Sequence, residues 1–432
     1  MLNIKLQSHV QSLVHPRVRS GERPVSAVEA QSPFGTPCLD DYEFLRTLGA
    51  GANATVYLVR ENRTSHLFAL KAVDKYSADG RKIACSTVIN EQTALTKLNG
   101  SDCILPLHTC FHDTENYYLV TEYLPGGDLE RLQRSKVLDV EAVRFYMAEL
   151  LLAIEHVHAH DIIHRDIKPE NIFIDTDGHI VLGDFGIAWL FDESSPDERV
   201  TRGQVGTPAF SSPEVLSGDE YGFGADLWAF GVILYEMLTG TDAFETNTVP
   251  ADDPTWLRHF SEHVKCDEPV MVESPLMTDD AMDLVRRLLV KSADSRLSDI
   301  TAIKNHPFFS MLDWTSVASR SLTPPWIPRL ISTRQVGVHF QQPVVYAGEQ
   351  YAPSDDPLPS FAFRVEPSSL SFACARRQLA FALLDGCAPL VSWVDGPSRE
   401  AEVGPRDVER QKSLKSLSRW VKRALNRPRH HA

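Results

Sequence analysis

Two short runs decide how this sequence is interpreted: His164-Arg-Asp-Ile-Lys-Pro-Glu-Asn171 and, thirteen residues later, Asp184-Phe-Gly186. Asp166 can accept the proton of an attacking hydroxyl, and Lys168 can neutralise charge on a transferring phosphoryl group. Asn171 offers a neutral oxygen ligand to a hard cation such as Mg²⁺, and the carboxylate of the second run can bridge that cation to phosphate oxygens. A chance match to both runs at this spacing is rare, so the sequence predicts chemistry on phosphate groups.

A glycine-containing turn precedes these runs and joins two stretches with strand-like alternation. It reads Gly49-Ala-Gly51-Ala-Asn-Ala54, and glycines let backbone N–H groups approach phosphate oxygens closely. An ordinary hairpin turn would look the same. Lys71 follows twenty residues after Gly51, and Glu91 lies twenty beyond Lys71. An ion pair between them would hold the ammonium group at phosphates, although each residue alone would be read as a solvated charge.

The hydrophobic pattern changes character once along the chain. Strand-like runs dominate residues 42–124, with one helix expected near residues 86–98. After Pro125-Gly-Gly127, apolar residues recur at helical spacing in residues 140–158, 223–238 and 279–289. We therefore expect an α+β fold with two lobes and a cleft between them.

In this order, the motifs resemble the catalytic domain of protein kinases over residues 42–309, with a small β-rich N-lobe (42–124) and a larger helical C-lobe (125–309). The sequence departs from the family pattern at Ala54, the place of a third glycine, and at Ser212-Pro-Glu214, where Ala-Pro-Glu is usual. The resemblance implies that Glu214 pairs with Arg296 and pins the activation segment to the C-lobe. Further matches are Asp226, Trp228, Gly231 and His306-Pro-Phe-Phe309.

The same resemblance implies an ATP site at the junction of the two lobes, with Mg²⁺ held by Asn171 and Asp184. Thr121-Glu-Tyr-Leu124 would be the hinge, in which the backbone of Glu122 and Leu124 hydrogen-bonds adenine. Asp128 would face the ribose. The remaining nucleotide-binding residues would be Leu48, Gly49, Gly51, Val56, Ala69, Lys71 and Glu91.

The residues around Lys168 are similar to those of serine/threonine kinases, because tyrosine kinases typically carry Arg near that point. Gly206-Thr-Pro-Ala-Phe210 agrees, and its Thr207 would hydrogen-bond Asp166 and Lys168. This implies transfer of the γ-phosphate of ATP to Ser and Thr hydroxyls of protein substrates. Two alternatives are a catalytically inactive binding module, which would lack a Lys, Asp or Asn that is present here, and a small-molecule kinase, which would lack the activation segment.

Substrate preference can be inferred from acidic residues at Asp128, Glu170 and Glu236, which resemble the contacts of basophilic kinases. Carboxylate pairs suit the planar guanidinium group, so we expect Arg two or three residues before the target hydroxyl. The alternative is that Glu170 and Glu236 form internal ion pairs.

Activation can be inferred from Arg165, which precedes the catalytic Asp, since such an Arg can bind a phosphate on the activation segment. The usual acceptor position is Gly203, which cannot be phosphorylated, and Thr201 is the nearest hydroxyl. We expect Thr201 to be a modest regulator, or the segment to be ordered without phosphate.

Residues 310–365 resemble the C-terminal tail of AGC-group kinases, because they contain Leu322-Thr-Pro-Pro-Trp-Ile-Pro328. A plain proline-rich linker is the alternative. Phe361-Ala-Phe363 differs in spacing from the aromatic motif that ends such tails, so docking on the N-lobe is not expected. Residues 366–405 have no interpretation.

The ends of the chain differ in charge from its centre. Residues 1–41 are expected to be a disordered extension that faintly resembles an organelle transit peptide. Residues 406–432, called here the basic tail, hold nine Lys and Arg against two acids, with apolar residues at helical spacing. Such a segment can bind an acidic membrane or protein partner and be released by phosphorylation at Ser413. A solubilising tail or a nuclear-import patch is the alternative.

Composition restricts the remaining function classes. The net charge of −15 argues against nucleic-acid binding, because phosphate backbones are held mainly by Lys and Arg. Seven scattered cysteines without a C-x-x-C pair fit a reducing compartment. We therefore expect a cytoplasmic protein, with nuclear or membrane-peripheral location as alternatives.

Overall fold

The computed structural model describes residues 36–51, 53–76, 85–135, 138–192, 199–244, 253, 255–269, 272–332, 343, 345, 347–352, 354–364, 374 and 389–392. The chain divides into two units after Thr36, and the fold below is that of the described residues from Pro37 onward. The predicted extension over residues 1–41 is too long, because Leu39–Asp41 is an ordered 3-10 turn (η1) whose Leu39 packs against the N-lobe core. The basic tail lies outside the described residues.

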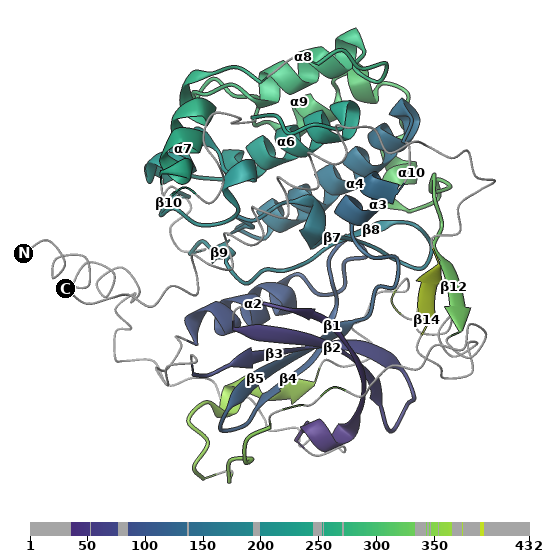
Figure 1. The fold of residues 1–432 in the computed structure, drawn as a ribbon, viewed down its shortest axis with the longest axis vertical. Helices are drawn as coiled ribbons and strands as arrows, with labels where there is room; N and C mark the ends of the chain where they lie inside the picture. Colours follow the sequence, from purple (N-terminus) through teal and green to yellow (C-terminus); the bar gives the residue numbers. More distant parts are fainter. Residues whose placement is uncertain are drawn as a thin grey trace, which may run out of the picture. The chain divides into compact units, whose positions relative to one another are not determined.

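The N-lobe is built on one antiparallel sheet of six strands in the order β1-β2-β3-β5-β4-β13 (Figure 1). Buried and partly exposed side chains alternate along β3, as the pleat of a strand requires, and Leu58 of β2 and Leu70 of β3 are fully buried. The strands are β1 Tyr42–Ala50, β2 Ala54–Glu61, β3 Leu67–Asp74, β4 Leu107–His112, β5 Asn116–Glu122 and β13 Phe363–Arg364. Helix α2, Ser86–Lys97, buries Val88 and Leu95 in the hydrophobic core.

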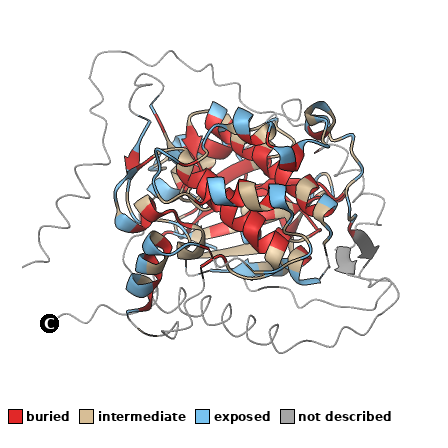
Figure 2. Ribbon diagram, turned by 90° about the horizontal axis from the view of Figure 1, so that it is seen from above, coloured by how far each residue is buried: buried red, intermediate tan, exposed pale blue. Residues whose placement is uncertain are grey.

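The C-lobe is a helical bundle whose central members are almost completely buried, and Figure 2 shows this buried centre in red. Asp139 begins helix α4 by accepting a hydrogen bond from Ala142 N. A side chain at Gly231 would meet Leu288 Cβ at 2.8 Å, so a glycine permits α6 and α8 to approach closely. The helices are α3 Leu129–Ser135, α4 Val140–Ala159, α5 Pro213–Ser217, α6 Gly224–Thr239, α7 Trp256–Cys266, α8 Asp279–Leu288, α9 Ile300–Lys304 and α10 Trp314–Ala318.

Short antiparallel strand pairs lie in the segments that connect or follow these helices. They pair β6 Ile162–Ile163 with β9 Trp189–Leu190, β7 Ile172–Ile174 with β8 Ile180–Leu182, β10 Thr201–Arg202 with β11 Glu220–Tyr221, and β12 Arg329–Ser332 with β14 Pro389–Ser392. Further 3-10 turns are η2 Pro169–Asn171, η3 Pro208–Phe210, η4 Pro307–Phe309 and η5 Pro359–Phe361. The bilobal α+β fold predicted from the sequence is confirmed. Strand β4 and helix α7 were not predicted.

The chain beyond residue 309 returns to both lobes. Arg320 donates to Asp175 Oδ2 at 2.8 Å, and Trp326 O lies so close to Gly178 that no side chain fits there. Farther along, Phe361 is 1% exposed, with its ring centroid 5.3 Å from that of Tyr117. The expectation that this aromatic motif would not dock on the N-lobe is therefore wrong.

Backbone pairing and charge explain why the motif docks despite its spacing. Phe363 pairs with Cys110 in β4, which extends the N-lobe sheet by one strand. Arg364 then forms ion pairs with Asp41 Oδ2 at 2.6 Å and Glu61 Oε1 at 3.1 Å. Among the described residues, no helix is both long and apolar enough to cross a membrane.

Candidate active site

A buried carboxylate at the start of α6 holds the loop that contains the first diagnostic run. Asp226 accepts hydrogen bonds from the backbone N–H of His164 and of Arg165, both at 2.9 Å. Arg165 adopts φ +68°, an uncommon conformation for a residue with a side chain, and these bonds offset its cost. The loop is thereby fixed by the C-lobe core rather than by solvent-exposed contacts.

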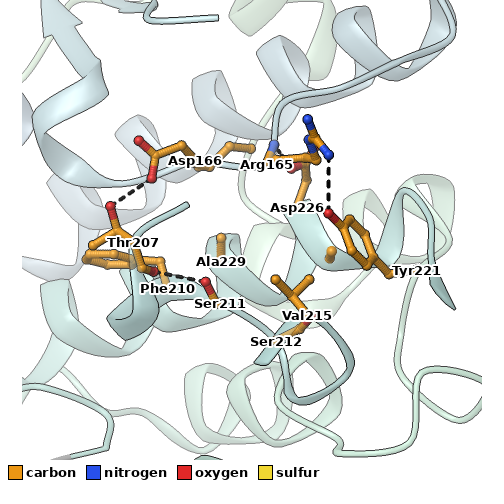
Figure 3. A pocket seen from close by; sticks show the side chains of 12 residues that line it. Arg165, Asp166, Thr207, Phe210, Ser211, Ser212, Val215, Tyr221, Asp226 and Ala229 are labelled. Carbon is orange, nitrogen blue, oxygen red and sulfur yellow. Dashed lines mark hydrogen bonds between the residues drawn. The ribbon is translucent and has the colours of Figure 1, made fainter. Parts of the chain in front are cut away.

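Asp166 lies at the centre of a hydrogen-bonded cluster (Figure 3). Its Oδ2 accepts from Lys168 Nζ at 2.7 Å, and its Oδ1 accepts from Thr207 Oγ1 at 2.7 Å. Lys168 also donates to Thr207 Oγ1 at 2.9 Å, which confirms the predicted three-residue arrangement. Burial lowers the pKa of Lys168, but the Asp166 carboxylate outweighs it and the pKa is raised, so the ammonium group stays charged.

A second cluster joins the two lobes. Lys71 Nζ lies 2.8 Å from both oxygens of Glu91 and 3.1 Å from Asp184 Oδ1. The register of β3 between β2 and β5, which sets Lys71 between Val56 and Leu119, positions the lysine. The Lys71 charge lowers the pKa of Asp184 to about 2, so this carboxylate is ionised at neutral pH.

The oxygen atoms available for a cation fit Mg²⁺ bound together with a nucleotide. Asn171 Nδ2 donates to Asp166 O at 2.8 Å, so the amide oxygen is the atom of Asn171 that can bind a cation. Asp184 has φ +61°, an uncommon backbone conformation for a residue with a side chain. The described residues contain no group of three or more His, Cys, Asp or Glu able to hold a metal alone. Mg²⁺ typically takes one or two carboxylates and completes its shell with phosphate oxygens and water.

The residues predicted to hold adenine and ribose come from neighbouring elements. Ala69 lies opposite Thr121 in the β3–β5 register, and Leu48 packs on the cluster that contains Tyr123. Glu122 N donates to Pro106 O at 3.0 Å, so this N–H is already used within the protein. Leu124 is buried.

The other predicted nucleotide residues flank that surface. Asp128 Oδ1 accepts from Arg131 N at 2.7 Å near the start of α3, and burial raises the pKa of Asp128. Gly51 N donates to Ala54 O at 2.7 Å and closes the glycine turn, while Gly49 pairs with Val56 across β1 and β2. The turn thus follows directly from the strand pairing.

A buried ion pair secures the far end of the activation segment. Arg296 donates to Glu214 Oε1 at 2.6 Å and Oε2 at 2.8 Å, which confirms the predicted pair. Burial raises the pKa of Glu214, but Arg296 outweighs it and lowers the pKa overall.

The predictions on substrate preference and on activation can be compared with the structure near the catalytic loop, and one residue there was not predicted. Glu170 is exposed, whereas Glu236 is buried within α6 and is therefore less accessible to a substrate than expected. Thr201 is buried in β10, so its hydroxyl is not presented for modification. Tyr221, whose hydroxyl contacts both the activation segment and Arg165, was not predicted, because a two-residue strand carries no recognisable period.

Comparison with known proteins adds an independent line of evidence. The family model described as "Protein kinase domain" matches residues 42–309. The chain is 33% identical over 300 residues to cAMP-dependent protein kinase type 3 of Saccharomyces cerevisiae, covering 68% of this chain and 71% of the relative. It is also 33% identical over 299 residues to the protein kinase C zeta type of Oryctolagus cuniculus, covering 68% of this chain and 49% of the relative. A RAC family serine/threonine-protein kinase homolog of Dictyostelium discoideum is 34% identical over 292 residues, covering 67% of this chain and 62% of the relative.

Proposed function

The chain belongs to the protein kinase family as a serine/threonine kinase of the AGC type, and from this premise we propose that it transfers the γ-phosphate of ATP to Ser and Thr of proteins that carry Arg before the target. One observation supports this most strongly. The hydrogen bonds of Asp166 to Lys168 and Thr207 coexist with the Lys71–Glu91–Asp184 cluster.

In the proposed mechanism, Asp166 accepts the proton of the substrate hydroxyl as that oxygen attacks the γ-phosphorus, while the bond from the γ-phosphorus to the β–γ bridging oxygen breaks and ADP leaves. Lys168, 2.7 Å from Asp166, neutralises charge on the transferring group. Lys71, oriented by Glu91, would hold the nucleotide phosphates, and Asn171 and Asp184 would hold Mg²⁺. When bound, Mg²⁺ neutralises charge that builds up on the phosphate oxygens.

The direct test is transfer of radiolabelled phosphate from ATP to a Ser/Thr peptide, with and without a chelator. Asp166→Asn is the control variant, because it keeps the size of the side chain and removes its basicity. Transfer by the wild type that is lost in Asp166→Asn and in the chelator supports the proposal. Equal transfer by both proteins would refute the assigned roles.

We further propose that Glu170 provides the accessible carboxylate for an Arg of the substrate. Its side chain is exposed in the catalytic loop, two residues after Lys168. A peptide array should favour Arg at the second or third position before the target, and Glu170→Gln should reduce that preference. Glu141→Gln, a change at an exposed acid that begins α4, is the matched control. Selection of acidic or proline-flanked peptides would contradict the proposal.

For the basic tail we propose an acidic membrane or protein partner, and hence a cytoplasmic location with a peripheral membrane pool. The charge of residues 406–432 supports this proposal. Deleting these residues should reduce binding to vesicles containing anionic lipid. No change in vesicle binding or in basal activity would leave only the solubilising role.

A further inference from the structure

The activation segment has no acceptor for phosphate at its usual position, which raises the question of what orders it. Phosphorylation orders such segments by creating a pair between phosphate and Arg. Here Arg165 is present, but Gly203 stands where that acceptor is expected. Gly203 also has φ +122°, a conformation that favours glycine over any residue with a hydroxyl side chain.

The hydroxyl of Tyr221 links the two groups that a phosphate would have joined. It donates to Gly203 O at 3.1 Å and accepts from Arg165 Nη1 at 3.4 Å (Figure 3 draws the second bond). Tyr221 is buried in β11, directly opposite Thr201 of β10. The Tyr221 side chain is therefore largely shielded from water, which strengthens both hydrogen bonds, and the one from the charged Arg165 is charge-assisted.

The remaining contacts of Arg165 connect the link to the start of the activation segment. Arg165 Nε donates to Ile187 O at 2.7 Å, and its guanidinium carbon lies 5.4 Å from the centre of the Trp189 ring. One side chain thus contacts the segment just after Asp184 and, through Tyr221, again at Gly203. These contacts use an aromatic face and neutral oxygens rather than a phosphate.

The part of the activation segment near Gly203 determines where the Thr207 hydroxyl lies relative to Asp166. A Cβ atom at Gly206 would lie 2.3 Å from Arg165 O, so the segment and the catalytic loop touch there. Thr207, the next residue, donates to Asp166. A shift at Gly203 would therefore move Thr207 away from the catalytic carboxylate.

We propose that Tyr221 is a positioning residue that holds the activation segment in its catalytic arrangement without phosphorylation. The inference rests on the proposed kinase function. It assigns to Tyr221 the mechanical role that a phosphorylated side chain has in kinases regulated at this segment. Thr201, buried opposite Tyr221, is not required as an acceptor.

The test compares wild type, Tyr221→Phe, Arg165→Met and the double variant, all treated with a protein phosphatase and checked for phosphate by mass spectrometry. Phosphatase-treated wild type should keep full activity. Tyr221→Phe should lower kcat/KM for peptide roughly tenfold, the factor that corresponds to about 1.4 kcal/mol, and leave KM for ATP unchanged. The double variant should have the same kcat/KM as the less active of the two single variants, because Tyr221 acts through Arg165. Tyr57→Phe, a change at a buried tyrosine of the N-lobe sheet, is the control.

Hydrogen exchange of residues 199–207 provides a readout that does not depend on activity. Tyr221→Phe should exchange faster there than the wild type, with no change in α6. Wild-type exchange and kinetics in Tyr221→Phe, or additive losses in the double variant, would overturn the inference. Loss of wild-type activity after phosphatase treatment would also overturn it. A wild type that transfers no phosphate would refute the proposed function, while the exchange data would still decide the role of Tyr221.

Discussion

Two ion-pair clusters in this chain have similar distances but different surroundings. Lys71 lies 2.8 Å from Glu91 and 3.1 Å from Asp184, and the Lys71 and Asp184 side chains remain 25% and 45% exposed. Arg296 lies 2.6 Å from Glu214, but its side chain is 0% exposed and also donates to the carbonyl of Val290. The first cluster is open to a ligand, whereas the second is enclosed by protein.

The difference indicates how one kind of interaction can have two roles. Charges that remain accessible can bind phosphate and a cation, so we expect them to contribute mainly to catalysis. Charges that are enclosed have no further partner to bind, and removing one leaves the other unpaired in the core. We therefore expect the open cluster to govern activity and the enclosed pair to govern stability.

The largest expected effect is on activity in the open cluster. Lys71→Met and Asp166→Ala should each reduce phosphate transfer by at least about a thousandfold, because positioning and charge stabilisation supply most of this catalysis. Asp184→Asn should abolish Mg²⁺-dependent phosphate transfer, because the variant loses the carboxylate that would bind the cation. The urea midpoint of Lys71→Met should fall by less than that of Arg296→Ala, because the side chains of Lys71 and Asp184 remain partly exposed to water. If Lys71→Met strongly destabilised the fold but kept its specific activity, the roles assigned to the open cluster and the enclosed pair would be contradicted.

The enclosed pair should show the opposite pattern. Arg296→Ala should lower the free energy of unfolding by about 3–5 kcal/mol, because the Glu214 carboxylate is left buried without its partner. Urea unfolding measures this change, and turnover per folded molecule should fall far less than in Lys71→Met. Arg296→Lys is the conservative control, and it should recover only part of the stability, since Lys cannot make both hydrogen bonds.

A pH series sharpens the comparison within the open cluster. The Lys71 charge holds the pKa of Asp184 at about 2, below the ordinary value of about 3.9 for an unfolded chain. Because the folded pKa is the lower one, ionised Asp184 stabilises the fold above pH ~4, and this contribution is lost as the pH falls from about 4 to about 2. In Lys71→Met the acid limb of the stability curve should be shallower. The same slope in Lys71→Met and in the control Lys304→Met would show that Lys71 does not set this pKa.

The smallest expected effect concerns an ion pair with both partners in water. Arg202 and Glu220 lie 2.7 Å apart, with side chains 67% and 55% exposed. Arg202→Ala should change the free energy of unfolding by less than about 1 kcal/mol, and the difference should shrink further in molar salt. A loss of unfolding free energy as large as that in Arg296→Ala would mean that burial does not explain the different contributions of the two ion pairs to stability.

The hydrogen-bonded arrangement around Asp166 was predictable from the sequence, because phosphoryl-transfer chemistry demands particular residue types at short spacing. Asp166, Lys168 and Asn171 lie within one loop, and the structure unites them with Thr207 as expected. Lys71 and Glu91 come from separate elements, yet the regular register of β3 and the following helix makes their meeting predictable.

The contacts that were not predicted depend on backbone pairing over long separations. Phe363 bonds to β4 through its main chain, which leaves no residue pattern to recognise. Tyr221 reaches Gly203 only because two-residue strands pair, and such strands are too short for periodicity. The buried position of Glu236 depends on the helices packed around α6, which local sequence does not reveal.

Strand β13 has a consequence for how the protein is synthesised. Its partner β4 leaves the ribosome about 250 residues earlier, which corresponds to between roughly 10 and 50 seconds at ordinary rates of translation. During that interval the outer edge of β4 is an unpaired strand edge that any extended segment can join. Truncated translation products that end before residue 364 should therefore aggregate more readily than the complete chain, because the edge of β4 stays unpaired in them.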